Sequence, residues 1–528
     1  MRIVCIGGGP AGLYFGLLMK GRNPEHEVTV VERNRPYDTF GWGVVFSDQT
    51  LGNLCAADAP SADAILDAFN HWDDIEINFR GQQVRSSGHG FCGIGRKRLL
   101  NILQARCEEL GVKLVFETQA TDDTAYEADL VIACDGANSA IRQTYAATYQ
   151  PDIDMRDCRF VWLGTKKLFD AFTFAFEETE WGWFQAHAYR FDDQTSTFIV
   201  ETPERVWRAA GLDEMSKEDS IAFCEKLFAK YLDGNPLLSN AAHLRGSSQW
   251  IRFPRVVNQE WVHWRSNANG AQPTPIVLMG DAAHTAHFSI GSGTKLAMED
   301  AIGLVQALGA EPDAARAFGR YEATRRPAVE RLQELARRSQ LWWESFPSRL
   351  HVPAGQLMVA YMTRAGNVPL DRLVTTNPGV VASALAQYAE QTPKTLNTAP
   401  LPADLTSWIL DRPLRYQGRQ FPHRVLADDP DGAGMHTITD VVADPWGQAA
   451  DAVVRRARRA RTDGSDGFRF TGPADRPSVL TRMDLAERVR TEVGGLIVVD
   501  APARLRDDLA AGLVSARADL VSFNEEDA

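Results

Sequence analysis

A glycine-rich turn near the start of the chain constrains its fold more than any other feature. The apolar run at residues 3–6 leads into Gly7-Gly8-Gly9-Pro10-Ala11-Gly12, residues 13–19 are typical of a helix, and a second apolar run ends at Glu32, 20 residues after Gly12. A strand, a GxGxxG turn, a helix and a strand with a terminal acid form the pattern of a dinucleotide-binding unit. The glycines would let the backbone approach a pyrophosphate at the helix N-terminus, and Glu32 would bind a ribose hydroxyl.

Two later apolar runs also end beside a carboxylate. Residues 128–134 lead into Asp135-Gly136, and residues 276–279 lead into Gly280-Asp281. In doubly wound sheets, ligands lie at the carboxyl ends of the strands, so both acids are expected near one ligand. The second turn is followed by Gly-Ser-Gly at 291–293 and then by a helix, whose N-terminus would turn its positive end toward that ligand.

These three motifs, in this order, resemble the FAD fingerprint of single-component aromatic hydroxylases, the flavoprotein monooxygenases of the p-hydroxybenzoate hydroxylase type. The resemblance implies that Asp281 binds the ribityl chain, that residues 291–295 lie by the flavin pyrimidine, and that Arg96 contacts the FAD phosphates. Asp135 and Gly136 are implied to lie near the pyrophosphate. The predicted cofactor-binding residues are Gly7, Gly9, Gly12, Glu32, Arg33, Arg96, Asp135, Gly136, Asp281, Gly291, Gly293, Thr294 and Lys295.

Over about residues 1–385 the chain is similar to one subgroup of this family, through the strings at 41–48, 186–190, 196–201 and 287–291. Members of that subgroup hydroxylate salicylyl-CoA, 2-aminobenzoyl-CoA or a tryptophan-derived intermediate of violacein synthesis. The resemblance implies one FAD per chain, NADH as reductant, and O2. It further implies hydroxylation of an aroyl-CoA ring through a flavin C4a-hydroperoxide, with salicylyl-CoA converted to gentisyl-CoA as the first expectation. 2-Aminobenzoyl-CoA and a free indole or other aromatic substrate are the alternatives.

The expected strand at residues 183–189 supplies candidate catalytic residues. Residues 183, 185, 187 and 189 share one face because side chains alternate along a strand. A ring hydroxyl or amino group must be activated toward electrophilic attack, and a histidine titrates close to the pH that this requires. We predict His187, His287 and Tyr189 as catalytic, and Trp42, Val45, Phe46, Gln185 and Phe288 as substrate-binding. Basic candidates for the CoA phosphates are Arg159, Lys166, Lys167, Arg190 and Arg364.

Composition excludes several other classes of protein. The net charge of −13 argues against nucleic-acid binding, which needs a basic surface. No apolar run approaches the ~18 residues of a membrane span, and the start of the chain lacks a signal-peptide pattern. The seven cysteines contain no CxxC pair, which favours a reduced cytoplasm and no zinc site. We therefore expect a cytoplasmic enzyme without a metal, nucleic acid or membrane partner.

The predicted fold is α/β. A Rossmann-like FAD-binding domain is expected at 1–71, 96–156 and 271–330, with an inserted mixed β-sheet substrate domain at 72–95 and 157–270. A helical segment at 331–390 and a linker at 391–412 are expected to precede a small α/β domain at 413–528.

That last domain resembles parts of an Old Yellow Enzyme-type barrel. A (β/α)8 barrel needs ~250 residues, whereas 116 remain from residue 413. The positions implied for an FMN phosphate read Asp-Ala-Pro at 500–502 and Phe-Asn-Glu at 523–525. We therefore predict a truncated TIM-barrel remnant without a second flavin. It is expected to pack on the hydroxylase, to help form a homodimer, or to line a CoA channel.

Two other functions are weaker alternatives. Trp181-Gly182-Trp183 resembles part of the flavin-dependent halogenase motif, but residues 184–186 break that motif. A non-catalytic scaffold would explain the degenerate tail, but the intact FAD motifs argue against it.

Overall fold

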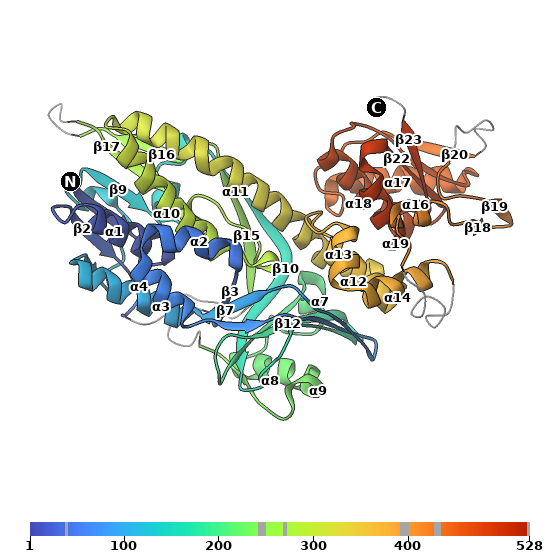
Figure 1. Ribbon diagram of the computed structural model, residues 1–528, viewed down its shortest axis with the longest axis horizontal. Coiled ribbons are helices and arrows are strands. Elements are labelled where there is room, and N and C mark those ends of the chain that lie inside the picture. The colour runs from blue at the N-terminus through green and yellow to red at the C-terminus, as the bar shows by residue number, and fades with distance from the viewer. Residues whose placement is uncertain (37–40, 241–249, 268–271, 391–400, 427–433, 525–528) are drawn as a thin grey trace. The chain divides into compact units, whose positions relative to one another are not determined.

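The computed structural model describes residues 1–36, 41–240, 250–267, 272–390, 401–426 and 434–524 (Figure 1). The chain divides into two compact units, residues 1–75 with 89–337 and residues 76–88 with 338–528. Most of the predicted linker, residues 391–400, and the chain end at 525–528 lie outside the described residues. None of the helices in the described ranges is long and apolar enough to cross a membrane.

A six-stranded sheet forms the base of the first unit. Its order is β16-β17-β9-β1-β2-β8, and all neighbouring pairs are parallel except β16 with β17. The strands are β1 (Arg2–Ile6), β2 (Glu27–Val31), β8 (Lys113–Val115), β9 (Leu130–Ala133), β16 (Val262–Arg265) and β17 (Thr274–Leu278). The central strands are runs of valine, isoleucine and leucine because parallel strands are covered on both faces. Their carboxyl ends meet at one edge, where the three predicted turns follow.

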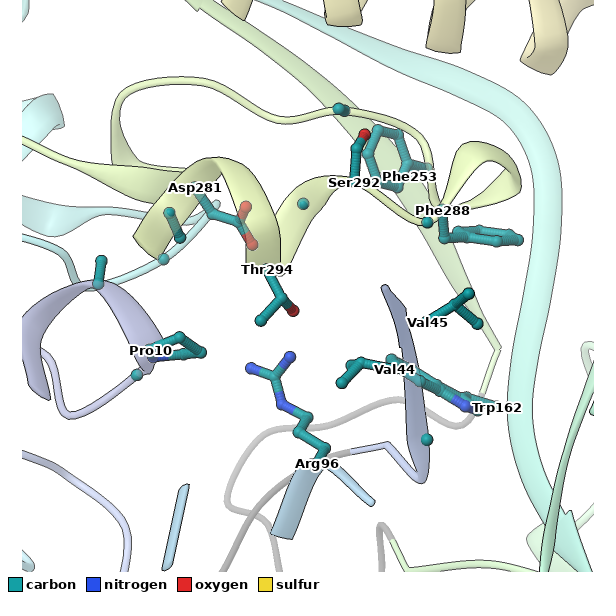
Figure 2. Close-up of a pocket in the computed structure, with 18 of the residues that line it drawn as sticks. Pro10, Val44, Val45, Arg96, Trp162, Phe253, Asp281, Phe288, Ser292 and Thr294 are labelled. Carbon is teal, nitrogen blue, oxygen red and sulfur yellow. The ribbon is translucent and has the colours of Figure 1, made fainter. Parts of the chain in front are cut away.

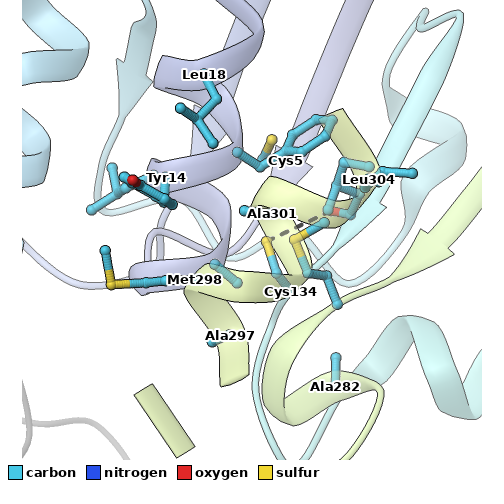
Figure 3. Close-up of a cluster of buried hydrophobic side chains, with 14 of the residues drawn as sticks. Cys5, Tyr14, Leu18, Cys134, Ala282, Ala297, Met298, Ala301 and Leu304 are labelled. Carbon is cyan, nitrogen blue, oxygen red and sulfur yellow. Dashed lines mark hydrogen bonds between the residues drawn. The ribbon is translucent and has the colours of Figure 1, made fainter. Parts of the chain in front are cut away.

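Three helices pack around that edge. They are α1 (Pro10–Arg22), α4 (Arg96–Leu110) and α10 (Gly293–Ala310), and α1 packs against both others. Pro10 is well placed at the first turn of α1, where its missing N–H has no helical acceptor. The side chains between α1 and α10 form a continuous core with Cys5, Tyr14 and Leu304 (Figure 3).

The turn after β17 is held between two of these helices. A Cβ atom on Gly280 would lie 3.2 Å from the side chains of both Ala11 and Ala297. Small residues on α1 and α10 therefore let this turn approach the two helix N-termini closely.

A second sheet in the first unit has the order β14-β10-β13-β12-β11, with β15 also paired to β10. These strands pair antiparallel and comprise β10 (Pro151–Thr165), β11 (Phe172–Thr179), β12 (Gly182–Arg190), β13 (Ser196–Pro203), β14 (Leu237–Leu238) and β15 (Ile251–Asn258). One face packs on α7 (Glu204–Ala209), α8 (Lys217–Leu227) and α9 (Ala229–Leu232) through residues such as Val200 and Phe228. The alternation of side chains leaves the other face for the site.

A smaller sheet brings further residues to the site. It has the order β3-β7-β4, with β3 (Gly43–Ser47), β4 (Asn70–Trp72) and β7 (Phe91–Gly95), and α2 (Asp48–Ala57) and α3 (Ala59–Leu66) connect β3 to β4. A Cβ atom on Gly41 would lie 2.6 Å from the Trp162 ring, and one on Gly43 would lie 2.6 Å from Phe191. Only glycine fits at these two positions, so Gly41 and the start of β3 can lie directly against Trp162 of β10 and Phe191, which follows β12.

Short helices complete the connections of the first unit. These are α5 (Ala140–Thr144), α6 (Ala146–Tyr149) and the 3-10 turns η1 (Asp123–Ala125), η4 (Gly280–Ala282) and η5 (Phe288–Ile290). The long helix α11 covers Ala314–Glu344, so it begins before the helical segment expected at 331–390.

The second unit contains helices and a four-stranded parallel sheet. The helices are η6 (Phe346–Arg349), α12 (Ala354–Thr363), α13 (Leu370–Thr376), α14 (Pro378–Tyr388), α16 (Leu405–Leu410), η7 (Ala503–Leu505), α17 (Gln448–Thr462), α18 (Arg476–Glu492) and α19 (Arg506–Val514). The sheet order is β20 (Met435–Ile438), β21 (Gly467–Phe470), β22 (Leu496–Pro502) and β23 (Leu520–Asn524). The second unit also contains two hairpins. They are β5 (Ile75–Phe79) with β6 (Gln82–Ser86), and β18 (Leu414–Tyr416) with β19 (Arg419–Phe421).

The helical segment and the C-terminal sheet share one core. Helices α12, α14 and α16 all pack against α19, and α16 falls within the range predicted as a linker. Arg349, 2% exposed, lies over the rings of Trp342 and Trp446 and donates a hydrogen bond to Glu487 at 2.8 Å. The described strands number half those of a (β/α)8 barrel, and the origin of this domain in a barrel stays a prediction.

Candidate active site

One cavity of about 270 Å³ lies at the sheet edge of the first unit (Figure 2). One part of its wall comes from the glycine-rich motifs, with Gly9, Pro10, Arg96, Gly136, Asp281 and residues 291–294. The rest is apolar and comes mainly from the larger sheet and β3, with Val44, Val45, Phe160, Trp162, Phe172, Tyr189, Ile199, Phe253 and Phe288. A polar, phosphate-compatible region therefore opens directly into an aromatic one.

The first glycine turn is shaped as a phosphate cradle. A Cβ atom on Gly12 would lie 2.7 Å from Cys134 Sγ, so this position must stay a glycine. Around Gly9, by contrast, no protein atom would lie within 4 Å of such a Cβ. The carboxylate of Glu32 accepts hydrogen bonds from the backbone N–H groups of Gly8 and Asn34, both at 2.8 Å. The turn is thus packed tightly from behind and open in front, as binding a pyrophosphate requires.

Opposite charges face each other across the cavity. Figure 2 shows the Arg96 guanidinium directed toward Thr294, with Asp281 beyond it. Burial lowers the pKa of Arg96, and the nearby carboxylates of Asp281 and Glu32 act in the opposite direction. The carboxylate of Asp281 opens onto the cavity deep in the protein, and burial raises its pKa against the effect of Arg96. An arginine that reaches into this space is suited to hold phosphate oxygens.

A buried ionic cluster fixes the turn that carries Asp281. Asp300, fully buried on α10, accepts hydrogen bonds from His284 Nε2 at 2.7 Å, Arg325 Nε at 3.0 Å and the backbone N–H of Gly280 at 3.3 Å. Burial alone would raise the pKa of Asp300, but His284 and Arg325 together hold it below its ordinary value. The ionised carboxylate therefore joins the turn, α10 and α11.

Arg142 joins the turn that carries Asp281 to the turn that carries Asp135. It donates to the carbonyl oxygens of Ala282 at 2.9 Å and Ala137 at 2.5 Å. Asp135 accepts hydrogen bonds from the backbone N–H groups of Ala140 and Ile141. Asp135 thus shapes its own turn, while Gly136 beside it lines the cavity.

The start of α10 faces the cavity through residues 292–294. Gly291 has a positive φ of 63°, which ends the preceding 3-10 turn, and a Cβ atom on Gly293 would meet no protein atom within 4 Å. The N-terminus of this 18-residue helix opens onto the cavity, so the N–H groups of its first turn and their positive potential face that space. This is a suitable environment for the negative charge that a reduced flavin carries.

A buried carboxylate lies behind the aromatic wall. Glu201, 1% exposed, accepts a hydrogen bond from Gln185 Nε2 at 3.1 Å. Its oxygens lie 3.6 Å from His187 Nε2 and 4.0 Å from His287 Nε2. Glu201 was not among the predicted site residues. The sequence feature that could have indicated Glu201 is a single acidic residue directly after the apolar residues 198–200.

Comparison with known proteins identifies the family. The FAD binding domain family matches residues 1–336. The chain is 35% identical to 3-hydroxy-4-methyl-anthranilyl-[aryl-carrier protein] 5-monooxygenase of Streptosporangium sibiricum, over 72% of this chain and 99% of that protein. The chain belongs to the FAD-dependent aromatic hydroxylases.

Other hydroxylases of this family are also similar. The salicyloyl-CoA 5-hydroxylase of a Streptomyces species is 44% identical over 356 residues, and the match spans 66% of each of the two chains. The protodeoxyviolaceinate monooxygenase of Chromobacterium violaceum is 30% identical, over 70% of this chain and 96% of that protein. A crystal structure of 2-methyl-3-hydroxypyridine-5-carboxylic acid oxygenase has the same fold, with a TM-score of 0.51 at 17% identity, covering 71% of this chain and 98% of that one.

The FAD motifs of this hydroxylase are brought together at the cavity. Gly9, Arg96, Gly136, Asp281, Gly291, Gly293 and Thr294 line it. Gly7, Gly12 and Glu32 support the turn from behind. The other three predicted cofactor residues do not line the cavity either: Asp135 holds its own turn, Arg33 is exposed, and Lys295 Nζ lies 3.8 Å from Glu299 on its own helix.

The predicted substrate and catalytic residues divide into two groups. Val45, Tyr189 and Phe288 line the cavity, and the other five do not line it, namely Trp42, Phe46, Gln185, His187 and His287. The hydroxyl of Tyr189 donates to the carbonyl oxygen of Gly43 at 2.8 Å, and burial raises the pKa of this phenol well above its usual value. The Trp42 ring packs against Gly164, and Phe46 packs against Phe69.

The basic candidates for CoA phosphates are mostly engaged by protein groups. Arg159 forms an ion pair with Glu204 and lies over the Trp207 ring, and Lys167 pairs with Asp233. In the second unit, Arg364 is held by Ser339 and Tyr361. Lys166 reaches Thr195 at 3.5 Å, and the buried Nε of Arg190 has no hydrogen-bond acceptor among the described residues.

Proposed function

We propose that this hydroxylase acts on the ring of an aromatic acid carried as a thioester, with salicylyl-CoA as the first candidate substrate and NADH and O2 as co-substrates. The observation that carries the proposal is the single cavity in which the flavin motifs meet an aromatic wall. Two relatives add the substrate class, because one is named for salicyloyl-CoA and the other for an anthranilyl group on an aryl-carrier protein. NADH as reductant is supported by the family resemblance. 2-Aminobenzoyl-CoA and a free indole or other aromatic compound are the alternatives.

The residues present fit FAD. The open cradle at Gly9, the guanidinium of Arg96 and the carboxylate of Asp281 suit a pyrophosphate and a hydroxylated chain, and the start of α10 suits the flavin ring. FAD, when bound, supplies the chemistry that activates oxygen and transfers a hydroxyl group.

Orienting the substrate and excluding water depend on this chain's own side chains. Trp162, Phe172 and Phe288 give the aromatic ring a rigid apolar wall, which orients it and keeps water away from the reaction. His187 and His287 adjoin this wall, with ring centroids 5.9 Å and 4.1 Å from that of Phe288. The prediction that this pair stabilises the ionised form of the ring hydroxyl, which would make the ring more reactive, requires the substrate to reach past the described wall, because neither imidazole lines the cavity.

The deciding experiment is mass spectrometry of products from a substrate panel. The panel contains salicylyl-CoA, 2-aminobenzoyl-CoA, the pantetheine thioester of salicylate, free salicylate and indole, each with NADH or NADPH and O2. We expect a product with one added oxygen atom, together with stimulated NADH oxidation, from the thioesters. Absence of stimulation by every aroyl-CoA would refute the proposal, and activity on the pantetheine thioester alone would favour a carrier-bound substrate.

The flavin content of the purified protein is a separate test. One FAD per chain and no FMN is expected, because the second unit is proposed to hold no flavin. Two flavins per chain would contradict that reading of the C-terminal domain.

A further inference from the structure

A second cavity lies wholly within the second unit. It has a volume of about 570 Å³, and the described residues that line it are 388–390, 412–415, 420–422 and 424. They come from the end of α14, the segment after α16, the hairpin β18–β19 and the chain that follows it. Binding sites for small molecules usually have volumes of roughly 300–1,000 Å³. This second cavity is therefore large enough for an organic ligand, and it shares no described residue with the FAD cavity.

The wall of the second cavity carries an excess of positive charge. Three arginines line it, Arg412, Arg415 and Arg424, against one acid, Glu390. None of the three forms an ion pair with any residue that the structure describes. This distinguishes them from two of the basic candidates of the first unit, which acidic side chains already neutralise. Because a guanidinium stays charged at physiological pH, the second cavity has a positive potential that favours an anion.

Arg424 is held in place by the protein itself. Its backbone N–H donates to the carbonyl oxygen of Leu410 at 2.7 Å, and its own carbonyl oxygen accepts from the N–H of Val521 at 2.9 Å. Its Nη1 donates to the carbonyl oxygen of Asp519 at 3.1 Å, and its Cζ lies 4.8 Å from the centroid of the Tyr388 ring. The Nε of Arg424 is buried and has no acceptor among the described residues. A buried donor without an acceptor is costly, so an acceptor supplied by a ligand would stabilise it.

Arg412 is likewise fixed, and its charge reaches the same part of the wall. Its Nε donates to the carbonyl oxygen of Trp408 at 3.1 Å, and its Cζ lies 4.3 Å from the centroid of the Trp408 ring. Burial raises the pKa of the Tyr388 phenol to about 12, and the charges of Arg424 and Arg412 act in the opposite direction. Both guanidinium groups are therefore close enough to act on one ring of the wall.

The hairpin β18–β19 adds the third arginine and a second aromatic ring. Arg415 on β18 lies opposite Gln420 on β19, and Phe421 follows Gln420 in the wall. The side chain of Arg415 is exposed and has no hydrogen bond or ion pair to any described residue, so it can adjust to a ligand. Phe421 and Tyr388 offer aromatic surface on which the planar part of a ligand can pack.

We propose that the second cavity binds a phosphorylated nucleotide, whose phosphate groups are held by Arg412, Arg415 and Arg424 and whose base packs against the aromatic side chains. Arginine suits phosphate oxygens because its planar fork can donate two parallel hydrogen bonds. The volume and the aromatic rings provide for more than an inorganic ion. Coenzyme A and a free adenine nucleotide share this chemistry. The inference goes beyond the proposed function and does not depend on it, because it concerns a different unit and a binding event that needs no turnover.

The test is calorimetric titration of the full-length, FAD-loaded protein with ADP, CoA and inorganic phosphate. We expect saturable binding of a nucleotide, tighter than that of phosphate. Arg415→Gln should weaken nucleotide binding about 10- to 100-fold, because it removes a charge-assisted hydrogen bond. Since Arg415 is exposed, this substitution should leave the fold intact. Arg419→Gln is the matched control and should leave the affinity unchanged, because Arg419 lies on the same hairpin, outside the wall, and is paired with Asp466.

Hydrogen exchange measured by mass spectrometry locates the bound nucleotide. The nucleotide should slow exchange in peptides that cover 411–424, and Arg415→Gln should remove this protection at the same nucleotide concentration. Tighter binding of CoA than of ADP would support the proposal with a CoA compound as the ligand, and equal binding would support it with a free nucleotide.

Several results would overturn the inference. They are the absence of nucleotide binding, binding that Arg415→Gln leaves unchanged, protection confined to the first unit, and phosphate binding as tight as that of both nucleotides. Any of these results would leave the outcome of the substrate panel, and with it the proposed function, standing.

Discussion

The same substitution at two glycines of the first turn should have opposite effects. Gly9 has an extended backbone, with φ −77° and ψ −177°, and a Cβ atom there would meet no protein atom within 4 Å. An alanine at this position should hardly change the stability of the protein, but its methyl group would enter the cavity where the pyrophosphate is expected. At Gly12 the Cβ would lie 2.7 Å from Cys134 Sγ and would also press on the carbonyl oxygen of Gly7. There the protein itself must move.

The expected magnitudes follow from these distances. Gly9→Ala should lose one or two charge-assisted hydrogen bonds to phosphate, about 1.5–3 kcal/mol, or about 10- to 100-fold in the Kd of FAD. The stability of its flavin-free form should change by less than about 0.5 kcal/mol. Gly12→Ala should destabilise the flavin-free protein by about 3 kcal/mol through overpacking.

Two measurements on each variant separate these effects: thermal unfolding of the flavin-free protein, and titration of FAD followed by its fluorescence. Gly52→Ala is the matched control, because Gly52 is exposed on α2 and a Cβ there would also meet no protein atom within 4 Å. The reasoning is refuted if Gly9→Ala binds FAD as tightly as the wild type, or if Gly12→Ala unfolds at the wild-type temperature.

Three further substitutions test other parts of the structure. Asp300→Asn should lower the free energy of unfolding by about 3 kcal/mol at neutral pH, because it breaks a buried ionic cluster. Since the pKa of Asp300 is lowered, this contribution is present above about pH 4 and disappears as the pH falls below that, so urea unfolding of the two proteins should converge in acid. Glu487→Gln removes the partner of the buried Arg349 and should lower the stability of the second unit by about 3–5 kcal/mol, seen in calorimetry, with the FAD content unchanged. Tyr189→Phe should lower the free energy of unfolding by about 1 kcal/mol, because it removes the hydrogen bond to the Gly43 carbonyl. An unchanged kcat would show that the hydroxyl serves that bond alone. A large loss of kcat would support the predicted catalytic role.

Local sequence patterns were enough to predict the three turns that the structure brings together at one sheet edge, and the role of their residues in holding FAD stays a prediction. The spacing of the glycine turn and of Glu32 depends on a single βαβ unit, and the strands that end at Asp135 and Asp281 belong to the same sheet edge. Alternation along β12 likewise placed His187 and Tyr189 on one face, as the register has it.

What the sequence did not reveal depends on contacts between distant segments. The position of Glu201 between two histidines requires the register of β12 against β13 and the approach of the segment 286–293. The same limit applies to Arg159 and Lys167, because their acidic partners lie 45 and 66 residues further along the chain. A count of basic residues cannot distinguish an arginine that is already neutralised from one that is available to a ligand.

The order of the strands also has a consequence for synthesis of the protein. The glycine turn forms from the first dozen residues, but the neighbours of β1 in the sheet include β9, and the next strand is β17, which delivers Asp281. About 270 residues separate Gly12 from Asp281, and at ribosomal rates of about 5–20 residues per second they take roughly 15–50 s to emerge. During that time the apolar strands β1 and β2 are already synthesised, but β16 and β17, which complete their sheet, are not. The nascent chain must therefore be kept from aggregation until the third turn appears, and FAD can be captured only late in translation.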